Sequence, residues 1–372
     1  MKKLMIVEFE INMINVENGD AILLMLKDGE RKSLIVIDGG YKKYYPKVKK
    51  RIEELLPLFD DKIDLLICTH YDNDHIGGIE KILDEYHDKI QEIWIHTIEE
   101  TVEQEVIFLN EQINSLQKNF IFVDYPSKIS ANFVIEAYQD LLRVVKKIRE
   151  YNLEEKMSQP FKGKIFQKFS EFKVAGPTYT FYERNLPALR KEAIKEDLKA
   201  NYENNKIDGI RKFSEFIADR KKIPDNQIND GSILEKSSLQ NGVTATNMVS
   251  IITLLQVGTK KILFTGDAGI ESFENEIPLW DTDLKDLFFL SLPHHGSKNN
   301  TSKKMIDIFN PQYVFVSAKG NKNYPSEHIT NYMKSQRNLL KFEVSNSDSK
   351  TWYLKIDHNG NFTRIFEKPF FT

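Results

Sequence analysis

The pattern of apolar and polar positions predicts an α/β protein whose strands fall into two groups. In the first hundred residues, Lys43–Leu56 places apolar side chains at helical spacing and Pro57 ends that helix, while another helix is expected from Ile79. Short apolar runs between turns predict strands at Ile6–Met13, Ala21–Leu26, Ser33–Ile37, Ile63–Cys68 and Glu92–His96.

The second group of strands lies in the C-terminal third of the chain. Helices are predicted at Ser302–Phe309 and Ser326–Arg337. Strands are predicted at Met248–Leu255, Lys261–Phe264, Leu287–Leu292, Tyr313–Val316, Thr351–Ile356 and Phe362–Ile365. Because some strands follow one another directly and others are separated by helices, we expect sheets covered by helices.

The middle of the chain has a different character. It is charged and helix-prone, as at Ala131–Tyr151 and Leu186–Ala200, although Phe120–Val123 and Phe172–Ala175 could rejoin a sheet. Asn226–Val243 is typical of a loop. We therefore predict one domain formed by residues 1–98 and 247–372, and a partly helical insertion, residues 99–246, that contains some core strands.

Composition narrows the class of protein. The formal net charge is −3, from 52 basic and 55 acidic residues, which excludes a global attraction to nucleic acid and leaves room only for a local basic channel. The single cysteine, Cys68, excludes an internal disulfide and fits a reducing compartment. Without a signal peptide or an apolar run of about 18 to 20 residues, we expect a cytoplasmic protein with no membrane segment.

The segment Thr69–Gly78 concentrates residues that bind metals. His70, Asp72, Asp74 and His75 fall within six positions directly after a predicted buried strand. Imidazole and carboxylate together suit zinc, manganese or iron, and a loop lets several side chains converge on one point. The alternative is a polar surface turn, but such turns rarely concentrate these residue types beside a strand end.

Three further strand ends carry residues of the same kind. Asp267 follows an apolar strand and can bridge two cations, although a solvated turn aspartate is the alternative for this residue taken alone. His294 and His295 follow another; because adjacent side chains usually diverge, we expect one to bind metal and the other to support it or contact substrate. Asp38 is expected to orient a ligand by hydrogen bonding, with a plain β-turn as the alternative.

Together these segments resemble the metallo-β-lactamase superfamily, and within it the hydrolase domain of the competence protein ComEC and its free-standing relatives. The likeness covers residues 4–97 and 247–340. It is carried, in the family's order, by Asp38-Gly39-Gly40, His70–Gly78, Asn247-Met248-Val249-Ser250, Thr265-Gly266-Asp267 and His294–Ser297.

This resemblance implies a four-layer αββα sandwich and two divalent metal ions, zinc or manganese. His70 and Asp72 would hold the first ion, with Asn247 where many superfamily members carry a third histidine, a replacement that favours manganese. The second ion would be held by Asp74, His75 and His294, and Asp267 would bridge the two. Asp38, Asn247, Ser250, Ser297 and Lys298 are the expected substrate-binding or supporting residues.

The resemblance also implies hydrolysis by a metal-bridging hydroxide, most naturally of a phosphodiester such as nucleic acid. Asp74 would steer the water, and His295 or His328 would stabilise transition-state charge; relatives carry a histidine where Tyr324 stands. The lysines after the His-His-Gly-Ser motif could contact phosphates, with scattered surface lysines as the alternative: Lys298, Lys303, Lys304, Lys319 and Lys322. The alternatives are a small-molecule ester, thioester or lactone as substrate, or a non-catalytic module stabilised by metal. Residues 99–246 are predicted to form a cap or to bind a protein partner.

Overall fold

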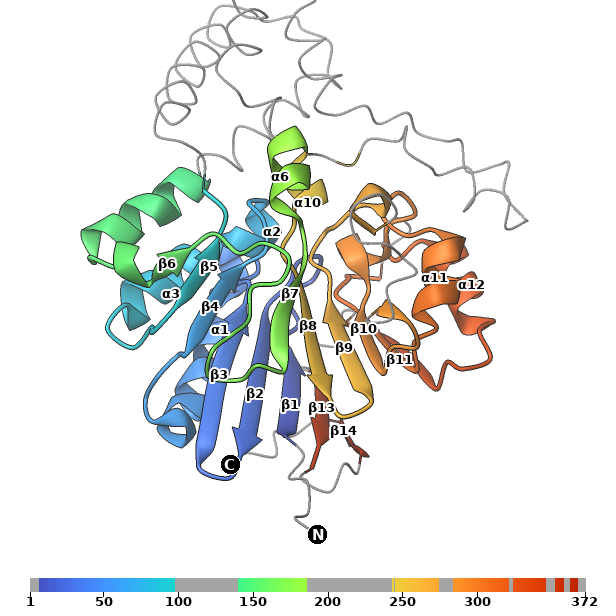
Figure 1. Cartoon of the computed structure of the whole chain (residues 1–372), viewed down its shortest axis with the longest axis horizontal. Helices are drawn as coiled ribbons and strands as arrows, with labels where there is room; N and C mark the ends of the chain where they lie inside the picture. The colour runs from blue at the N-terminus through green and yellow to red at the C-terminus, as the bar shows by residue number, and fades with distance from the viewer. Residues whose placement is uncertain are drawn as a thin grey trace, which may run out of the picture.

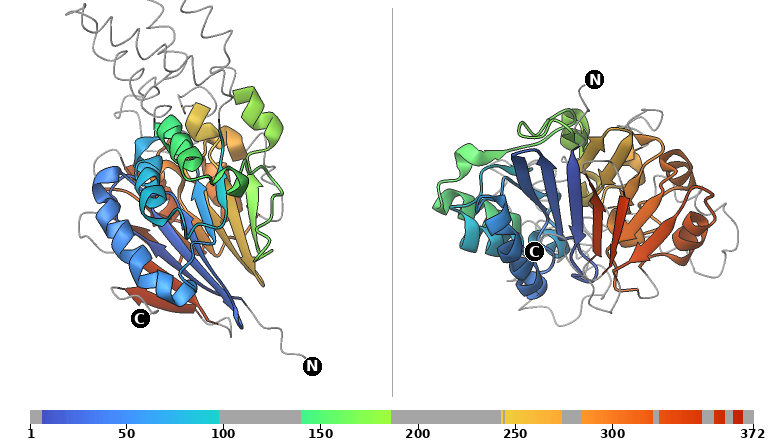
Figure 2. Two further views of the ribbon diagram at one scale, coloured as in Figure 1. Left: turned by 90° about the vertical axis from the view of Figure 1, so that its left-hand side faces the viewer. Right: turned by 90° about the horizontal axis from the view of Figure 1, so that it is seen from below.

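Two β-sheets lie face to face, and helices cover the outer face of each (Figures 1 and 2). The computed structural model describes residues 7–97, 140–185, 243, 245–273, 284–320, 324–345, 352–357 and 362–366. The fold is thus the four-layer α/β arrangement that the strand pattern and the family resemblance predicted.

Within the described residues, the first sheet has eight strands in the order β14-β13-β1-β2-β3-β4-β5-β6. The strands from β14 to β3 are antiparallel, whereas β3 to β6 run parallel. Their bounds are β1 Glu8–Met13, β2 Ile22–Asp28, β3 Arg31–Ile37, β4 Leu65–Cys68, β5 Ile93–Ile95, β6 Met157–Ser158, β13 Trp352–Ile356 and β14 Phe362–Phe366. The last two strands of the chain therefore extend the sheet that the first strand begins.

The second sheet has six strands among the residues that the structure describes, in the order β12-β11-β10-β9-β8-β7. The strands β9, β10, β11 and β12 run parallel to one another. β8 pairs antiparallel with β9, and β7 pairs antiparallel with β8. Their bounds are β7 Phe172–Gly176, β8 Ile252–Val257, β9 Lys260–Phe264, β10 Phe289–Ser291, β11 Tyr313–Val316 and β12 Lys341–Val344. The sequence pattern did not predict β12, a short half-buried edge strand in which charged residues alternate with apolar ones.

Helices connect the parallel strands and pack on the outer faces. Residues 140–150 are also helical, and Ser302 caps α11 by accepting a hydrogen bond from the Met305 amide at 3.1 Å. The helices are η1 Lys42–Tyr44, α1 Tyr45–Leu55, η2 Leu56–Phe59, α2 Asn73–Ile76, α3 Ile79–Tyr86, η3 Glu154–Lys156, α6 Tyr179–Asn185, α10 Ala245–Met248, η8 Pro293–Gly296, α11 Lys303–Phe309 and α12 Glu327–Lys334. Within the described ranges, none of them has the length and apolar character required to cross a bilayer.

Alternating burial along the strands produces three apolar layers. In β2, Leu24 faces the second sheet and joins the same core as Phe264, whereas Leu23 faces outward and packs with Val48 of α1. The other sheet repeats this pattern, because Leu263 belongs to the outer core that α11 and α12 cover. Each fully buried side chain of this size contributes about 1.5 to 3 kcal/mol, so both faces of each sheet are held firmly.

The structure bears on the predictions for the middle of the chain and on the strand predicted at Met248–Leu255. β6 and β7 lie within residues 99–246; β6 belongs to the first sheet and β7 to the second. Residues 140–150, part of the predicted helix Ala131–Tyr151, are helical. The predicted strand Met248–Leu255 begins too early, because its first residue ends α10 and β8 starts only at Ile252. The predictions at Phe120–Val123 and Leu186–Ala200, almost all of Asn226–Val243, and Lys322 lie outside the described residues.

Candidate metal centre

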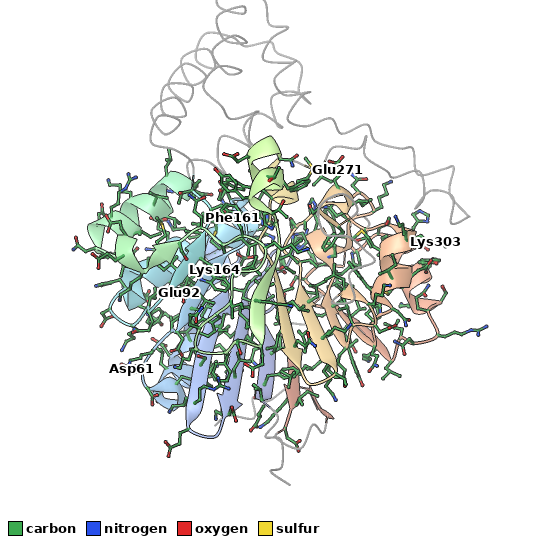
Figure 3. All side chains as sticks on the ribbon, in the orientation of Figure 1. Asp61, Glu92, Phe161, Lys164, Glu271 and Lys303 are labelled. Atoms are coloured by element: carbon green, nitrogen blue, oxygen red, sulfur yellow. The ribbon has the colours of Figure 1, made fainter. Side chains whose placement is uncertain are left out.

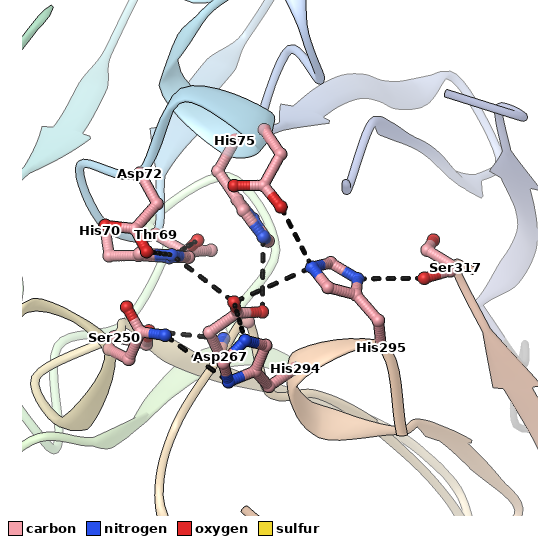
Figure 4. A network of polar contacts seen from close by, with 12 residues as sticks. Thr69, His70, Asp72, His75, Ser250, Asp267, His294, His295 and Ser317 are labelled. Carbon is pink, nitrogen blue, oxygen red and sulfur yellow. Dashed lines mark hydrogen bonds and ion pairs between the residues drawn. The ribbon is translucent and has the colours of Figure 1, made fainter. Parts of the chain in front are cut away.

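The ligand-type residues meet at one end of the sandwich because of strand direction. Parallel strands carry their carboxyl ends to the same edge of a sheet, and the loops after them line a common crevice. Asp38 follows β3 and the His70–His75 segment follows β4 in the first sheet, while Asp267 follows β9 and the two adjacent histidines follow β10 in the second. The two sheets thus supply the cluster jointly (Figure 4).

The Asp267 carboxylate lies at the centre of four imidazole rings (Figure 4). Its Oδ1 is 3.2 Å from Nε2 of His75, and its Oδ2 is 3.7 Å from Nε2 of each of His70, His294 and His295. Oδ1 and the Nε2 atoms of His70 and His75 are buried and make no hydrogen bond. Buried polar atoms are normally satisfied, so this set of lone pairs fits a bound cation.

On the first-sheet side, hydrogen bonds fix which nitrogen of each ring is free. Asp38 Oδ2 lies 2.8 Å from His75 Nδ1 and accepts a bond from the Thr69 hydroxyl at 2.6 Å. The Thr69 hydroxyl oxygen in turn lies 3.1 Å from His70 Nδ1 and accepts a hydrogen bond from it. Both rings therefore carry hydrogen on Nδ1 and direct Nε2 toward Asp267, as metal-binding histidines direct it toward their ion.

The second-sheet histidines are held in the same way. His295 Nδ1 lies 2.8 Å from the Ser317 carbonyl oxygen, and His294 Nδ1 lies 3.0 Å from Oδ1 of Asn300. The side-chain NH₂ group of Asn300 donates to the Asp267 backbone carbonyl at 2.8 Å, so the side-chain oxygen of Asn300 faces His294. All four rings are therefore arranged to offer Nε2.

The expectation that adjacent histidines diverge is wrong for this loop. His294 and His295 have φ values of 47° and 55°, in the left-handed region, and so both rings turn toward Asp267. Such a conformation costs about 1 to 2 kcal/mol per residue, a strain that is typical of functional sites. Tyr324 stacks on His294 with ring centroids 5.7 Å apart and meets His295 edge-on at 6.1 Å.

Close backbone contact joins the loops after β3 and β4. A Cβ on Gly78 would lie 2.1 Å from the carbonyl oxygen of Gly39. The amide of Gly39 donates to the His75 carbonyl at 2.8 Å, and that of Gly78 donates to Gly40 at 2.8 Å. Glycine is required at this point because the two backbone segments touch and leave no room for a side chain. The same contact brings Asp38 against His75.

Two more carboxylates border the cluster on its open side. Asp74 Oδ2 is 3.1 Å from His295 Nε2, and Asp72 Oδ2 is 4.0 Å from His70 Nε2. Their side chains are 18 % and 32 % exposed, whereas that of Asp267 is 2 % exposed. Potential ligand atoms come within 4.8 Å of one another in the groups His70, His75, Asp267 and Asp74, His75, His295.

Electrostatics divide the histidines into two kinds. Burial, together with the positive charge of His75, lowers the pKa of His70 to about 3, so that this ring is neutral. Burial also opposes charge on His75 and His295, but Asp267 with Asp38 raises the pKa of His75 well above its usual range. Asp267 and Asp74 likewise raise the pKa of His295 to about 9. Without a cation, these two rings hold protons that balance the carboxylates.

The carboxylates respond to the same crowding. Burial, followed by the charges of Asp74 and Asp267, raises the pKa of Asp72 to about 7. The pKa of Asp267 falls well below its usual range because the nearby histidines outweigh burial. This concentration of negative charge needs positive charge to stabilise it, and divalent cations supply more of it than protons do.

The other predicted residues lie at varying distances from the cluster. Ser250 Oγ accepts from the Asp267 amide at 3.2 Å, and the Asn247 amide nitrogen is 3.4 Å from His294 Nδ1. Ser297 instead accepts from the Asn299 amide at 3.2 Å, within its own loop. Lys298 is half-buried just after that loop, and His328 lies in the first turn of α12, outside the groups of candidate ligands.

Four supporting residues were missed by the sequence reasoning, and one of them is Thr69, whose hydroxyl orients His70. Asn300 and Ser317 orient His294 and His295, and Asp20 forms a third group of close ligand atoms with Asp38 and His75. Burial raises the pKa of Asp20. Its position in the Gly19-Asp20-Ala21 turn was a usable signal, but Ser317 acts through its carbonyl oxygen, which no sequence pattern reveals.

Comparisons with known proteins show what this chain is similar to. The family model described as the metallo-beta-lactamase superfamily matches residues 18–110. Among solved structures, the metallo-beta-lactamase fold protein YhfI from Bacillus subtilis is similar, with 11 % identity over 93 % of this chain and 99 % of that one and a TM-score of 0.40. No curated protein matches the sequence. Over residues 18–110 the chain is therefore similar to the metallo-beta-lactamase superfamily, and its two-sheet sandwich is the fold that this resemblance implies.

Proposed function

We propose that this protein is a metal-dependent hydrolase of phosphodiesters. The observation that carries the proposal is the convergence of four Nε2 atoms on the buried carboxylate of Asp267, with Asp72 and Asp74 on the open side. A pair of divalent cations bound there would lower the pKa of water toward neutrality and stabilise charge on the attacked group.

The distances favour a symmetrical assignment of ligands. Asp74, His75 and His295 would hold one ion, because their ligand atoms form one close group. His70, Asp72 and His294 would hold the other, with Asp267 shared. His294 then supplies the nitrogen that Asn247 does not, so each ion would have two nitrogen and two oxygen ligands, a set that suits zinc as well as manganese.

The remaining chemistry is assigned to the exposed side of the centre. Substrate would approach over Asp72 and Asp74, whose side chains are the more exposed carboxylates of the cluster. Asp74 would accept a proton from the attacking water and hold it in line. Tyr324, which packs against both rings of the His294-His295 pair, would keep them in place as substrate binds.

The phosphodiester class is supported by the ordered motifs of ComEC-like hydrolases in the sequence. The test combines metal analysis of the purified protein with assays on bis-p-nitrophenyl phosphate, single-stranded and duplex DNA, and RNA. Asp267→Ala is expected to abolish hydrolysis and to lower metal content. Unchanged turnover would exclude the bridging role of Asp267, and a protein that binds two metals but cleaves none of these substrates would exclude the phosphodiesterase.

A further inference from the structure

A cluster of lysines and tyrosines lies beside the open side of the metal centre. Three of its members come from the segment after β3: Tyr41, Lys43 and Tyr44. The Nζ atom of Lys43 lies 5.3 Å from the centre of the Tyr41 ring and 4.6 Å from that of Tyr44. Lys319, which follows β11, completes the group, and we name these four residues the Tyr-Lys rim.

Glu17 stands between the two cations of the rim. Its carboxylate lies 3.7 Å from Nζ of Lys43 and 3.4 Å from Nζ of Lys319. A hydrogen bond from Tyr44, together with the charges of Lys319 and Lys43, lowers the pKa of Glu17. The Lys319 amide also donates to the Asn18 side chain at 2.8 Å, so the loops of both sheets meet at this turn.

The lysines remain available to an anion. Their side chains are 63 % and 53 % exposed, for Lys43 and Lys319 respectively, and two ammonium groups share the single carboxylate of Glu17. Exposed ion pairs of this kind contribute little to stability, because water and salt screen the two charges. A phosphate group can therefore take over their partnership with Glu17 at small cost.

Backbone contacts connect the rim to the metal centre. A Cβ on Gly19, two residues after Glu17, would lie 2.4 Å from the Asp74 carbonyl oxygen, and the Asp20 amide donates to that oxygen at 3.2 Å. Tyr41 directly follows Gly40, whose amide donates to Asp20 at 2.8 Å. The rim therefore adjoins Asp74, which is on the side where substrate would approach.

From this placement we infer that the Tyr-Lys rim binds single-stranded nucleic acid next to the metal centre. Lys43 and Lys319 contact phosphates, and the rings of Tyr41 and Tyr44 stack on bases. Cations alternating with aromatic rings are the features that bind single strands without sequence preference, whereas a duplex hides the faces of its bases. The inference rests on the proposed function and specifies its substrate as a polynucleotide chain.

Binding is measured independently of hydrolysis. The full chain is treated with EDTA, and the fluorescence anisotropy of a labelled 12-residue oligothymidylate is followed between 50 and 200 mM NaCl, that is, over roughly the range in which phosphate contacts weaken with salt. Lys43→Ala with Lys319→Ala is expected to weaken binding several-fold and to reduce the salt slope by about 1.4, since each phosphate contact on a single strand contributes about 0.7.

The matched control removes the same charge elsewhere. Lys164 pairs at 3.6 Å with Glu92, the residue just before β5 (both are labelled in Figure 3), and Lys147 pairs with Asp84 of α3 at 3.1 Å. Lys164→Ala with Lys147→Ala is expected to bind the oligonucleotide as the unaltered chain does. Thermal unfolding of every variant separates lost binding from lost folding.

A variant with the opposite expected effect sharpens the test. Glu17→Gln removes the competing carboxylate but keeps a similar shape, so it should tighten binding of the oligonucleotide. If Glu17 instead only organises the loops for another purpose, Glu17→Gln will leave binding unchanged or weaken it. Tyr41→Leu should weaken binding of oligothymidylate and spare inorganic polyphosphate, which has charges but no bases.

The inference is overturned if the unaltered chain does not bind, if both double variants weaken binding equally, or if a methylphosphonate 12-mer, whose backbone is neutral, binds as tightly. These outcomes leave the hydrolysis of bis-p-nitrophenyl phosphate untouched. Conversely, a chain that binds the 12-mer through the rim but hydrolyses no diester would refute the proposed function and keep the rim as a binding site.

Discussion

Asp38→Asn replaces one carboxylate oxygen with an NH₂ group and is expected to weaken metal binding, because Asp38 orients the candidate ligand His75. Asp38 Oδ1 accepts from the Thr69 amide at 2.7 Å, and Oδ2 serves both the Thr69 hydroxyl and His75 Nδ1. An asparagine NH₂ in place of Oδ1 would face another donor, the buried Thr69 amide. In place of Oδ2 it would force the proton of His75 onto Nε2, which removes the lone pair needed for a metal.

The magnitude follows from these contacts. Hydrogen bonds to a charged group contribute about 1.5 to 3 kcal/mol, so the loss of Asp38's charge should lower the free energy of unfolding by at least this amount. Removing a partner that orients a metal-binding histidine typically lowers metal affinity by about 10- to 100-fold. That range corresponds to about 1.4 to 2.7 kcal/mol of binding free energy.

Metal affinity is measured by competition with a chromophoric chelator, and stability by chemical unfolding of the metal-free protein. Asp64→Asn is the matched control, because Asp64 is also buried and accepts from the Leu34 amide at 3.0 Å, at the other end of β4. The control should lose stability and keep its metal affinity. If Asp38→Asn binds metal as tightly as the unaltered chain, Asp38 does not orient His75 for ligation.

Two further predictions concern the same centre. Gly78→Ala forces a Cβ to within 2.1 Å of the Gly39 carbonyl oxygen, so it should lower the free energy of unfolding by at least about 2 kcal/mol and weaken metal binding. As a control, Gly269→Ala places its Cβ no closer than 3.3 Å to neighbouring side chains and should have a mild effect. Similar melting temperatures for the two variants would contradict this prediction. The pKa of His295 is about 9 in the folded protein, against about 6.5 in the unfolded chain, so between these values only the folded state keeps the His295 proton. The free energy of unfolding of the metal-free protein should therefore fall by up to about 3 kcal/mol as pH rises from about 6.5 to about 9. His295→Gln and metal loading should each flatten this dependence in thermal unfolding scans, and a melting temperature that rises over the same range would exclude it.

Much of the fold was accessible from the sequence because its strands are short, apolar and bounded by turns. Tyr313–Val316 was predicted with its observed bounds, and β3 and β4 were predicted to within two residues at either end. β12 escaped because Lys341 and Glu343 alternate with apolar residues in a run of only four. Its place at a sheet edge is set by pairing with β11, which no local pattern encodes.

The candidate site was predictable where side chains follow strand ends, as for His70 and Asp267. It was not predictable where backbone geometry decides. The positive φ values of His294 and His295 arise in a loop that is held by neighbours on other strands, and sequence spacing alone implied that the two rings would diverge. The same limit applies to Ser317, because any residue has a carbonyl oxygen.

The pairing of β1 with β13 has a consequence for the order in which the chain becomes protected. Phe9 is opposite Ile356 and Met13 is opposite Trp352, so the outer edge of β1 gains its partner only after the intervening residues 14–351 have been synthesised. Until then an apolar strand has unpaired backbone groups, the kind of edge that recruits other chains. A product that stops before β13 would therefore aggregate even though every candidate metal ligand is present in it.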